Sequence, residues 1–173
     1  FKSPNYPFLA EAGVEIEYNE HAFLKAISSA GRQNSKTLKV HTDLDNSILV
    51  LKLFPGLNEK IISSLINTKG IKAIILETFG AGNATTQAWF VNELKAAIKR
   101  GVIIYNVTQC HEGRVVQGMY ETSRQLKTIG VVSGHDITYE SAVAKLMFLL
   151  GQKLPANKIK QLLEKNLRGE ITE

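Results

Sequence analysis

Four apolar segments of the sequence are each followed at once by small and polar residues that could bind a ligand. These following segments are 54–56 (FPG), 77–83 (ETFGAGN), 108–112 (TQCHE) and 133–136 (SGHD). Together they offer carboxylates, amides, imidazoles, hydroxyls and a thiol, which are the groups used in acid–base and nucleophilic catalysis. Loops that face water are polar for solvation alone, so each segment has to be weighed on its own pattern.

The loop at 79–85 (FGAGNAT) is the most distinctive, because it places two glycines ahead of a helix. A dinucleotide-binding turn needs G-x-G-x-x-G, but here Gly80 and Gly82 are followed by Thr85 where the third small residue belongs. No acid stands at a strand end about 20 residues further on to hold a ribose, and no Walker A sequence occurs. Asn83 can donate and accept hydrogen bonds and tolerates unusual backbone angles beside glycine. The pattern leaves two roles open for Asn83, a turn former and a residue that contacts a ligand.

The spacing of cysteine and histidine does not predict a metal site. Cys110 and His111 are adjacent, so their side chains point apart on an extended segment, and the other histidines show no paired ligand spacing. We expect no metal and no cofactor. We expect Cys110 to be a small buried residue at a strand end rather than a nucleophile. As the only cysteine, it excludes a disulfide within the chain, which suits a reducing compartment.

Length and composition indicate one globular domain. The chain has 173 residues, of which 44% are hydrophobic, enough for a sizeable core. The net charge of +5 comes from scattered basic residues that do not alternate with aromatics, so we predict a solvated surface and no nucleic-acid partner. No apolar run approaches the roughly 20 residues of a bilayer span, and no signal peptide is recognisable, so we expect no membrane partner and a cytoplasmic location. The absence of an initial methionine suggests that the sequence begins partway through a longer chain.

Strands and helices are expected to alternate along most of the chain. We predict strands at 48–54, 71–76, 102–107 and 131–132, and helices at 61–66, 90–98, 120–129, 138–150 and 156–167. Gly151 is expected to stop the fourth helix, which Thr138 can cap. This alternation predicts a Rossmann-like α/β fold: a small parallel sheet of about four strands with helices on both faces.

The first third of the sequence is less regular. A half-buried strand is predicted at 14–18, a loop at 28–36 and a short strand at 38–40. We expect these segments to form a linker and a small antiparallel appendage. The predicted division is therefore 1–36 for the linker and first strand, and 37–173 for the α/β domain.

Five motifs, in order and at near-constant spacing, resemble the C-terminal domain of type I (cytoplasmic) L-asparaginases. They are ETFGAGNATT (77–86), NVTQCHEGRV (106–115), GMYETSRQL (118–126), IGVVSGHDITYESAVAKLMFLLGQ (129–152) and NLRGEIT (166–172). The segment SPNYPFLAEAGVEIEY at 3–18 looks like the link between that family's catalytic domain and this one. The resemblance covers essentially the whole chain.

The resemblance implies hydrolysis of L-asparagine to L-aspartate and ammonia by an amidohydrolase that needs no metal or cofactor. In that family a threonine nucleophile acts with a second threonine, a lysine, an aspartate and a tyrosine of the N-terminal domain. The signatures of that domain, T-G-G-T-I and G-T-D-T, do not occur here, and HTDLD at 41–45 is interpreted as a turn. We therefore expect no catalytic residue in this chain and no activity of the chain alone. Alternatives are a glutaminase, a subunit that amidates charged transfer RNA, and a nucleotide-binding module without catalysis.

The resemblance also implies a homo-oligomer, dimer or tetramer, in which this domain completes the active site of a neighbouring subunit. By motif, Asn83 is the first candidate to reach the substrate there and Tyr120 the second, with ring packing under the following helix as the alternative role of Tyr120. Some family members carry a second, regulatory asparagine site, and Glu77, Asn83 and Cys110 match its position. Glu77 stands where an arginine would bind the effector's carboxylate, so we expect effector control to be lost. A structural ion pair is the alternative role of Glu77.

Overall fold

The computed structural model describes residues 7–23 and 40–172 of the chain. The predicted loop at 28–36, the predicted domain boundary after 36 and most of the predicted strand at 38–40 lie outside these residues. Val40, the described end of that predicted strand, belongs to no strand.

The central element is a parallel sheet of four strands, as the sequence predicted. Its strands are β3 (Ile48–Lys52), β4 (Ala73–Thr78), β5 (Ile103–Thr108) and β6 (Val132–Ser133). They lie in the order β3-β4-β5-β6, so each strand pairs with the next along the chain. The carboxyl ends of all four strands therefore meet at one edge of the sheet.

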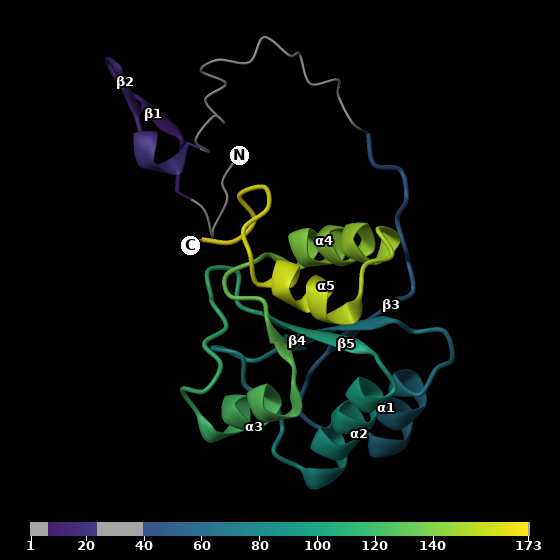
Figure 1. The fold of residues 1–173 in the computed structure, drawn as a ribbon. Helices are drawn as coiled ribbons and strands as arrows, with labels where there is room; N and C mark the ends of the chain where they lie inside the picture. Colours follow the sequence, from purple (N-terminus) through teal and green to yellow (C-terminus); the bar gives the residue numbers. More distant parts are fainter. Residues whose placement is uncertain (1–6, 24–39, 173) are drawn as a thin grey trace.

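Helices cover both faces of this sheet (Figure 1). The connecting helices are α1 (Glu59–Ile66), α2 (Ala88–Lys99) and α3 (Glu121–Ile129). Successive right-handed crossovers that all move in one direction place their helices on the same face. The two helices after the last strand, α4 (Tyr139–Gly151) and α5 (Ala156–Leu163), cover the opposite face.

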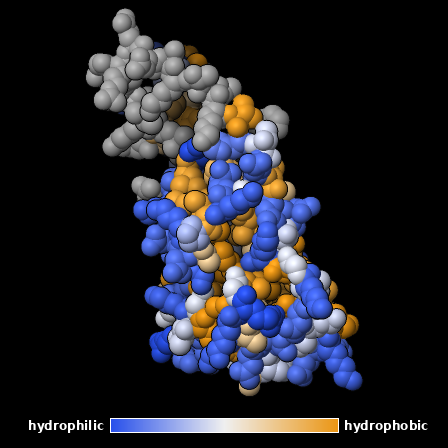
Figure 2. All heavy atoms as spheres, turned by 45° about the vertical axis from the view of Figure 1, so that its right-hand side comes forward, coloured by the Kyte–Doolittle hydropathy of each residue, from blue (hydrophilic) through white to orange (hydrophobic). Residues whose placement is uncertain are grey.

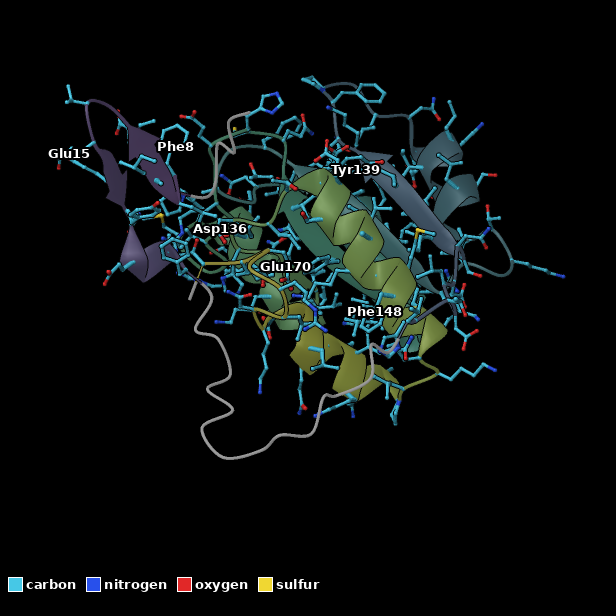
Figure 3. The ribbon with its side chains drawn as sticks, turned by 90° about the horizontal axis from the view of Figure 1, so that it is seen from above. Phe8, Glu15, Asp136, Tyr139, Phe148 and Glu170 are labelled. Carbon is cyan, nitrogen blue, oxygen red and sulfur yellow. The ribbon has the colours of Figure 1, made fainter. Side chains whose placement is uncertain are left out.

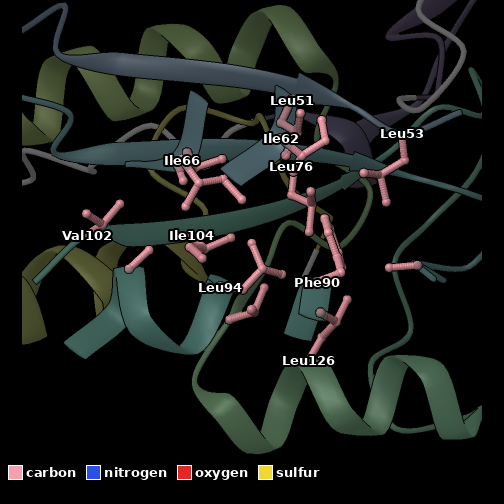
Figure 4. Packing of buried hydrophobic residues seen from close by; sticks show 14 residues of the cluster. Leu51, Leu53, Ile62, Ile66, Leu76, Phe90, Leu94, Val102, Ile104 and Leu126 are labelled. Atoms are coloured by element: carbon pink, nitrogen blue, oxygen red, sulfur yellow. The ribbon is translucent and has the colours of Figure 1, made fainter. Parts of the chain in front are cut away.

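Two hydrophobic cores result from the alternation of side chains along each strand. Leu76 and Ile104 belong to the core shared with α1, α2 and α3, which Figure 4 shows from close by. Ile75 and Tyr105, their neighbours in the strands, belong to the core shared with α4 and α5. Both faces of β4 and β5 are buried, which explains why their sequences are almost continuously apolar.

Two helix ends differ from the sequence-based prediction. The Thr138 side chain does accept the N–H of Ser141 at the start of α4, but Gly151 lies inside the helix rather than after it. A Cβ on Gly151 would overlap the carbonyl oxygen of Asp43, so the glycine permits a close approach of two chain segments. Helix α5 ends at Leu163, four residues earlier than predicted, because the following residues leave the helix to reach α4 and the loop after β6.

The N-terminal region contains a hairpin of β1 (Ala10–Ala12) and β2 (Ile16–Tyr18), followed by the short 3-10 helix η1 (Glu20–Ala22). An antiparallel appendage was predicted, but the strand expected at 14–18 is shorter. All residues of both strands are exposed rather than half-buried. The hairpin forms a separate two-stranded sheet that stands apart from the four-stranded sheet (Figure 1), so the core of that sheet does not cover it.

The surface is mixed in character. On the face shown in Figure 2, hydrophilic side chains predominate and apolar ones show between them. Among the helices of the described residues, none is long and apolar enough to cross a bilayer.

Candidate functional site

The candidate site lies at the carboxyl edge of the sheet, where the loops after β4 and β5 meet. Ligands of open parallel sheets often bind where the strand order reverses. The described sheet has no such reversal, since its four strands follow in sequence order. A binding crevice of that kind is therefore absent from the described sheet, and the loops themselves have to supply the site.

The loop after β4 is a tight turn closed by its own backbone. The N–H groups of Gly82 and Asn83 both donate to the carbonyl oxygen of Phe79, at 3.0 and 2.8 Å, and the N–H of Phe79 donates to the oxygen of Asn83 at 2.9 Å. The Thr108 hydroxyl at the end of β5 donates to the oxygen of Gly80 at 2.6 Å. These bonds fix the loop on the neighbouring strand and place Asn83 at its outer end.

Gly82 shows why this loop needs glycine. Its φ angle is 98°, and a Cβ there would lie 2.7 Å from Cγ1 of Val115 and 3.2 Å from Nδ2 of Asn106. That amide of Asn106 also donates to the carbonyl oxygen of Gly82 at 3.3 Å. The glycine therefore serves close packing of two loops as well as the turn.

The Asn83 side chain is held by one hydrogen bond and keeps its amide available. Its Oδ1 accepts the hydroxyl of Thr122 at 2.6 Å, from the first turn of α3. Asn83 is partly exposed, and no acceptor for its Nδ2 group occurs among the described residues. The arrangement presents a fixed N–H donor at the edge of the sheet, which suits a carboxylate or carbonyl of a ligand.

Tyr120 lies immediately before α3, two residues from the threonine that holds Asn83. It is 52% exposed, so its ring is not packed under the helix. Its backbone N–H donates to the hydroxyl of Ser123 at 3.2 Å, and that hydroxyl donates back to the Tyr120 oxygen at 2.9 Å. The start of α3 is thus anchored while the phenol ring remains accessible.

Glu77 and Cys110 flank Gln109 in the same region. The amide of Gln109 donates to the backbone oxygens of Leu53 and Glu77, at 2.7 and 2.8 Å, and so ties the ends of β3 and β4 to the loop after β5. Within 7–23 and 40–172, the structure records no ion pair of the Glu77 carboxylate. Cys110 is exposed, so its predicted burial is wrong. The chain leaves the sheet after Thr108, so Cys110 lies outside the core.

The turn of Gly82 and Asn83 provides no phosphate cradle. Such a cradle needs free backbone N–H groups near a helix N-terminus, but those of Gly82 and Asn83 are bonded within the turn and α2 begins only at Ala88. Among the described residues, no group of three or more His, Cys, Asp or Glu side chains could hold a metal ion.

The sequence patterns did not predict the buried polar side chains at the ends of β4 and β5, below the loops that follow these strands. The Thr78 hydroxyl, fully buried at the end of β4, donates to Oδ1 of Asn106 at 2.6 Å and to the oxygen of Val107 at 3.1 Å. A polar residue inside an otherwise apolar strand, such as the asparagine in 102–107, is the signal that could have pointed to this network.

A second buried polar network lies on the other face of the sheet, away from the loops (Figure 3 labels Glu170). Lys145 of α4 is buried, and its Nζ donates to the carbonyl oxygens of Leu163 and Lys165 at 3.0 and 2.6 Å. It also contacts Oε1 of Glu170 at 2.8 Å. The phenol of Tyr105 donates to the same Leu163 oxygen at 2.9 Å. The network holds the end of α5 and the chain after it onto the core.

The pKa values of this network follow from burial and from these bonds. Burial lowers the pKa of Lys145, and its bond to Glu170 opposes that effect only in part. Burial alone would raise the pKa of Glu170, but hydrogen bonds from Lys145 and from the N–H groups of Arg168 and Leu167 outweigh it and lower this pKa. Burial raises the pKa of Tyr105. The lowered pKa of Glu170 favours its carboxylate form, and the network is structural in role.

Comparison with known proteins gives a consistent result. Residues 47–163 match the family model described as the glutaminase/asparaginase C-terminal domain. L-asparaginase 1 of Escherichia coli is 35% identical over 172 residues, which are 99% of this chain and 48% of that protein. The 60 kDa lysophospholipase of Mus musculus is 37% identical over 173 residues, 99% of this chain and 29% of that protein.

A solved structure matches both the fold and the sequence. L-asparaginase I from Vibrio cholerae superimposes with a TM-score of 0.84 at 38% identity, over 99% of this chain and 50% of that one. The chain therefore spans about half the length of these two asparaginases. On the family model, the fold and these identities, the chain belongs to the family of glutaminase/asparaginase C-terminal domains.

Proposed function

We propose that this chain is the C-terminal domain of a type I L-asparaginase, an enzyme that converts L-asparagine to L-aspartate and ammonia. The observation that carries the proposal is the fixed carboxamide of Asn83, whose Oδ1 is held by Thr122 and whose Nδ2 is unbonded among the described residues. The similarity to two L-asparaginases supports the substrate class. The chemistry itself requires an activated hydroxyl and oriented donors for the oxyanion, which the preceding domain would supply.

In this proposal the domain acts on the active site of a neighbouring subunit in a homo-oligomer, in the cytoplasm. Asn83 donates its amide to the bound amino acid, and the exposed phenol of Tyr120, two residues before the threonine that holds Asn83, contacts the same ligand. Neither group takes part in bond cleavage. Both bind and orient the substrate, so their loss should act on substrate affinity and turnover more than on folding.

The test uses the complete polypeptide and the 173-residue chain side by side. Ammonia release from asparagine is expected for the complete polypeptide and not for this chain alone. Asn83→Ala in the complete polypeptide should lower kcat/KM, while Asn92→Ala, an exposed asparagine on α2, should not. A large loss of stability in Asn83→Ala with normal kinetics would contradict the proposed role. Faster ammonia release from glutamine than from asparagine would identify the alternative function, a glutaminase.

We also propose that effector control by asparagine is absent. The region of Glu77, Asn83 and Cys110 matches the family's regulatory site, but the carboxylate of Glu77 repels an amino-acid carboxylate where an arginine would bind it. Hyperbolic dependence of rate on asparagine is expected for the complete enzyme. Sigmoidal dependence in the unmodified protein would refute this part of the proposal.

A further inference from the structure

Two adjacent residues, Val115 and Val116, join two loops at the carboxyl edge of the sheet. The N–H of Val116 donates to the carbonyl oxygen of Ala81 at 2.9 Å, in the turn after β4. The N–H of Val115 donates to the carbonyl oxygen of His135 at 2.7 Å, in the loop after β6. The Val115 side chain is buried, and its Cγ1 would lie 2.7 Å from a Cβ on Gly82, so it packs directly against the first loop. The position of the turn after β4 therefore depends on the loop after β6.

A second connection between the same two loops runs through Asn106 of β5. The N–H of Gly134 donates to the carbonyl oxygen of Asn106 at 2.7 Å, and the side-chain amide of Asn106 donates to the oxygen of Gly82 at 3.3 Å. A Cβ on Gly134 would lie 2.6 Å from the Asn106 oxygen, so the approach of these two segments needs a glycine. The loops after β4 and β6 are therefore held together at two points.

His135 has a backbone conformation that its surroundings must hold in place. Its φ angle is 53°, and it is one of two non-glycine residues with a positive φ in the described part of the chain. This conformation is unfavourable for a residue with a Cβ, so it persists where neighbouring contacts fix it. The N–H of His135 donates to the hydroxyl of Ser133 at 3.2 Å, and the N–H of Ile137 donates to the oxygen of Gly134 at 3.0 Å. The resulting turn directs the His135 oxygen toward Val115.

Asp136, the next residue, ties this turn to the chain after α5. Its Oδ1 accepts the N–H of Thr172 at 3.0 Å, from a residue 36 positions further on. Ile171 is buried in the core shared with α4 and α5, and Glu170 is bound to the buried Lys145. Thr172 is thus a fixed donor, because the two residues before it are anchored. Figure 3 shows Asp136 beside the chain that carries Glu170.

We propose that Asp136 is a positioning residue for the substrate-binding amide of Asn83. Its carboxylate fixes the turn at His135, this turn holds 115–116, and 115–116 holds the loop that carries Asn83. This inference rests on the proposed function, since it takes Asn83 as the group that binds the amino acid. Thr122 orients the Asn83 side chain directly, so Asp136 sets where the amide stands and Thr122 sets how it points.

The first test is kinetic and uses the complete polypeptide. Asp136→Ala should raise the KM for asparagine at least about fivefold with a smaller change in kcat, because a displaced donor weakens binding and takes no part in bond cleavage. Asp136→Asn keeps an oxygen acceptor for the N–H of Thr172 and should restore KM to within about twofold of the unmodified enzyme. The matched control is Asp45→Ala, at the opposite edge of the sheet, which loses bonds to the Ser47 N–H and to Lys72. It should lower stability and leave KM unchanged.

A double-mutant cycle shows whether Asp136 acts through Asn83. In the Asn83→Ala background, Asp136→Ala should change KM less than about twofold, since the group that it positions is gone. Equal fold-changes in the two backgrounds overturn the proposal, because the carboxylate would then act on binding by another route. Failure of Asp136→Asn to restore KM also overturns it, since the hydrogen bond would not be the cause. Thr172→Pro removes the N–H donor and leaves Asp136 in place, so it should reproduce the rise in KM and replaces Asp136→Ala if that variant does not fold.

A second readout separates this inference from the proposed function. Hydrogen–deuterium exchange of the complete polypeptide is followed by mass spectrometry in peptides that cover 79–86 and 114–118, without substrate. Asp136→Ala should speed exchange in both peptides at least about threefold relative to Asp45→Ala, because the N–H groups of both segments lose their support. Unchanged exchange overturns the proposal, and so does faster exchange with an unchanged KM in an active enzyme. Faster exchange in a polypeptide that releases no ammonia from asparagine upholds Asp136 as the residue that positions the turn and rejects the proposed function alone.

Discussion

Replacement of Gly82 by alanine tests the packing of the loop that carries Asn83. The backbone of Gly82 has a φ of 98°, and the new Cβ would stand 2.7 Å from Cγ1 of Val115 and 3.2 Å from Nδ2 of Asn106. Val115 is buried, so its methyl group has no solvent to move into. The substitution should therefore force two packed loops apart.

The expected loss of stability is the sum of three effects. A left-handed backbone costs an L-residue about 1–2 kcal/mol, and overpacking of a dense site costs about 1–3 kcal/mol. Disturbance of the amide bond from Asn106 to the Gly82 oxygen adds about 1 kcal/mol. Because the loops can share the strain, we expect Gly82→Ala to lower the free energy of unfolding by about 3–5 kcal/mol in total.

Gly80→Ala is the matched control, two residues earlier in the same turn. Its φ is 49°, close to the ordinary left-handed region, and no heavy atom lies within 4 Å of a Cβ built there. Only the backbone cost of about 1–2 kcal/mol should remain. Urea denaturation followed by circular dichroism gives both values. If the two variants lose equal stability, the close approach to Val115 has no energetic weight and the reasoning is wrong.

Two further predictions concern the site and the buried ion pair. In the complete enzyme, Thr122→Val should lower kcat/KM for asparagine about fivefold, because it removes one neutral hydrogen bond to Asn83 worth about 1 kcal/mol. The control is Thr128→Val, which loses only an exposed hydrogen bond within α3 and should leave kcat/KM unchanged. Glu170→Gln should cost about 1.5–3 kcal/mol of stability at pH 7, because it leaves the buried charge of Lys145 without its carboxylate. The folded pKa of Glu170 is lowered, so its contribution is present above the ordinary pKa of a glutamate and is lost as pH falls through the folded value. Urea unfolding from pH 7 down to pH 3 should therefore show the difference from the unmodified protein shrinking, and a constant difference would argue against an ionic role.

Local sequence patterns were sufficient for the fold. Apolar runs predicted β3, β4 and β5 to within a few residues, since β4 and β5 are buried on both faces and β3 is partly buried. The cap at Thr138 was predictable because it depends on residues three positions apart. The length of α5 was not, because the chain after Leu163 is drawn out of the helix by partners some 20 to 36 residues away.

The candidate site was predictable only in part, because its hydrogen bonds join residues that lie far apart in the sequence. Asn83 stood out through its two neighbouring glycines, which signal a turn at a strand end. Thr122, which orients it, lies 39 residues away and carries no local signal. Gln109 reaches a backbone oxygen 56 residues earlier, and nothing in its surrounding sequence distinguishes it from a solvated loop residue. Long-range hydrogen bonds of this kind become visible only when the strands are placed side by side.

Two threonine hydroxyls at the carboxyl edge of the sheet have structural roles. Hydrolysis of an amide needs a hydroxyl with a base at hydrogen-bonding distance. The Thr78 hydroxyl is fully buried and donates to Asn106 and to the backbone, and that of Thr108 donates to the Gly80 oxygen while it accepts the N–H of Cys110. Neither has an imidazole or carboxylate partner among the described residues, and both hold loops in place. These two hydroxyls are therefore structural, and under the proposed function a nucleophile would come from another part of the protein.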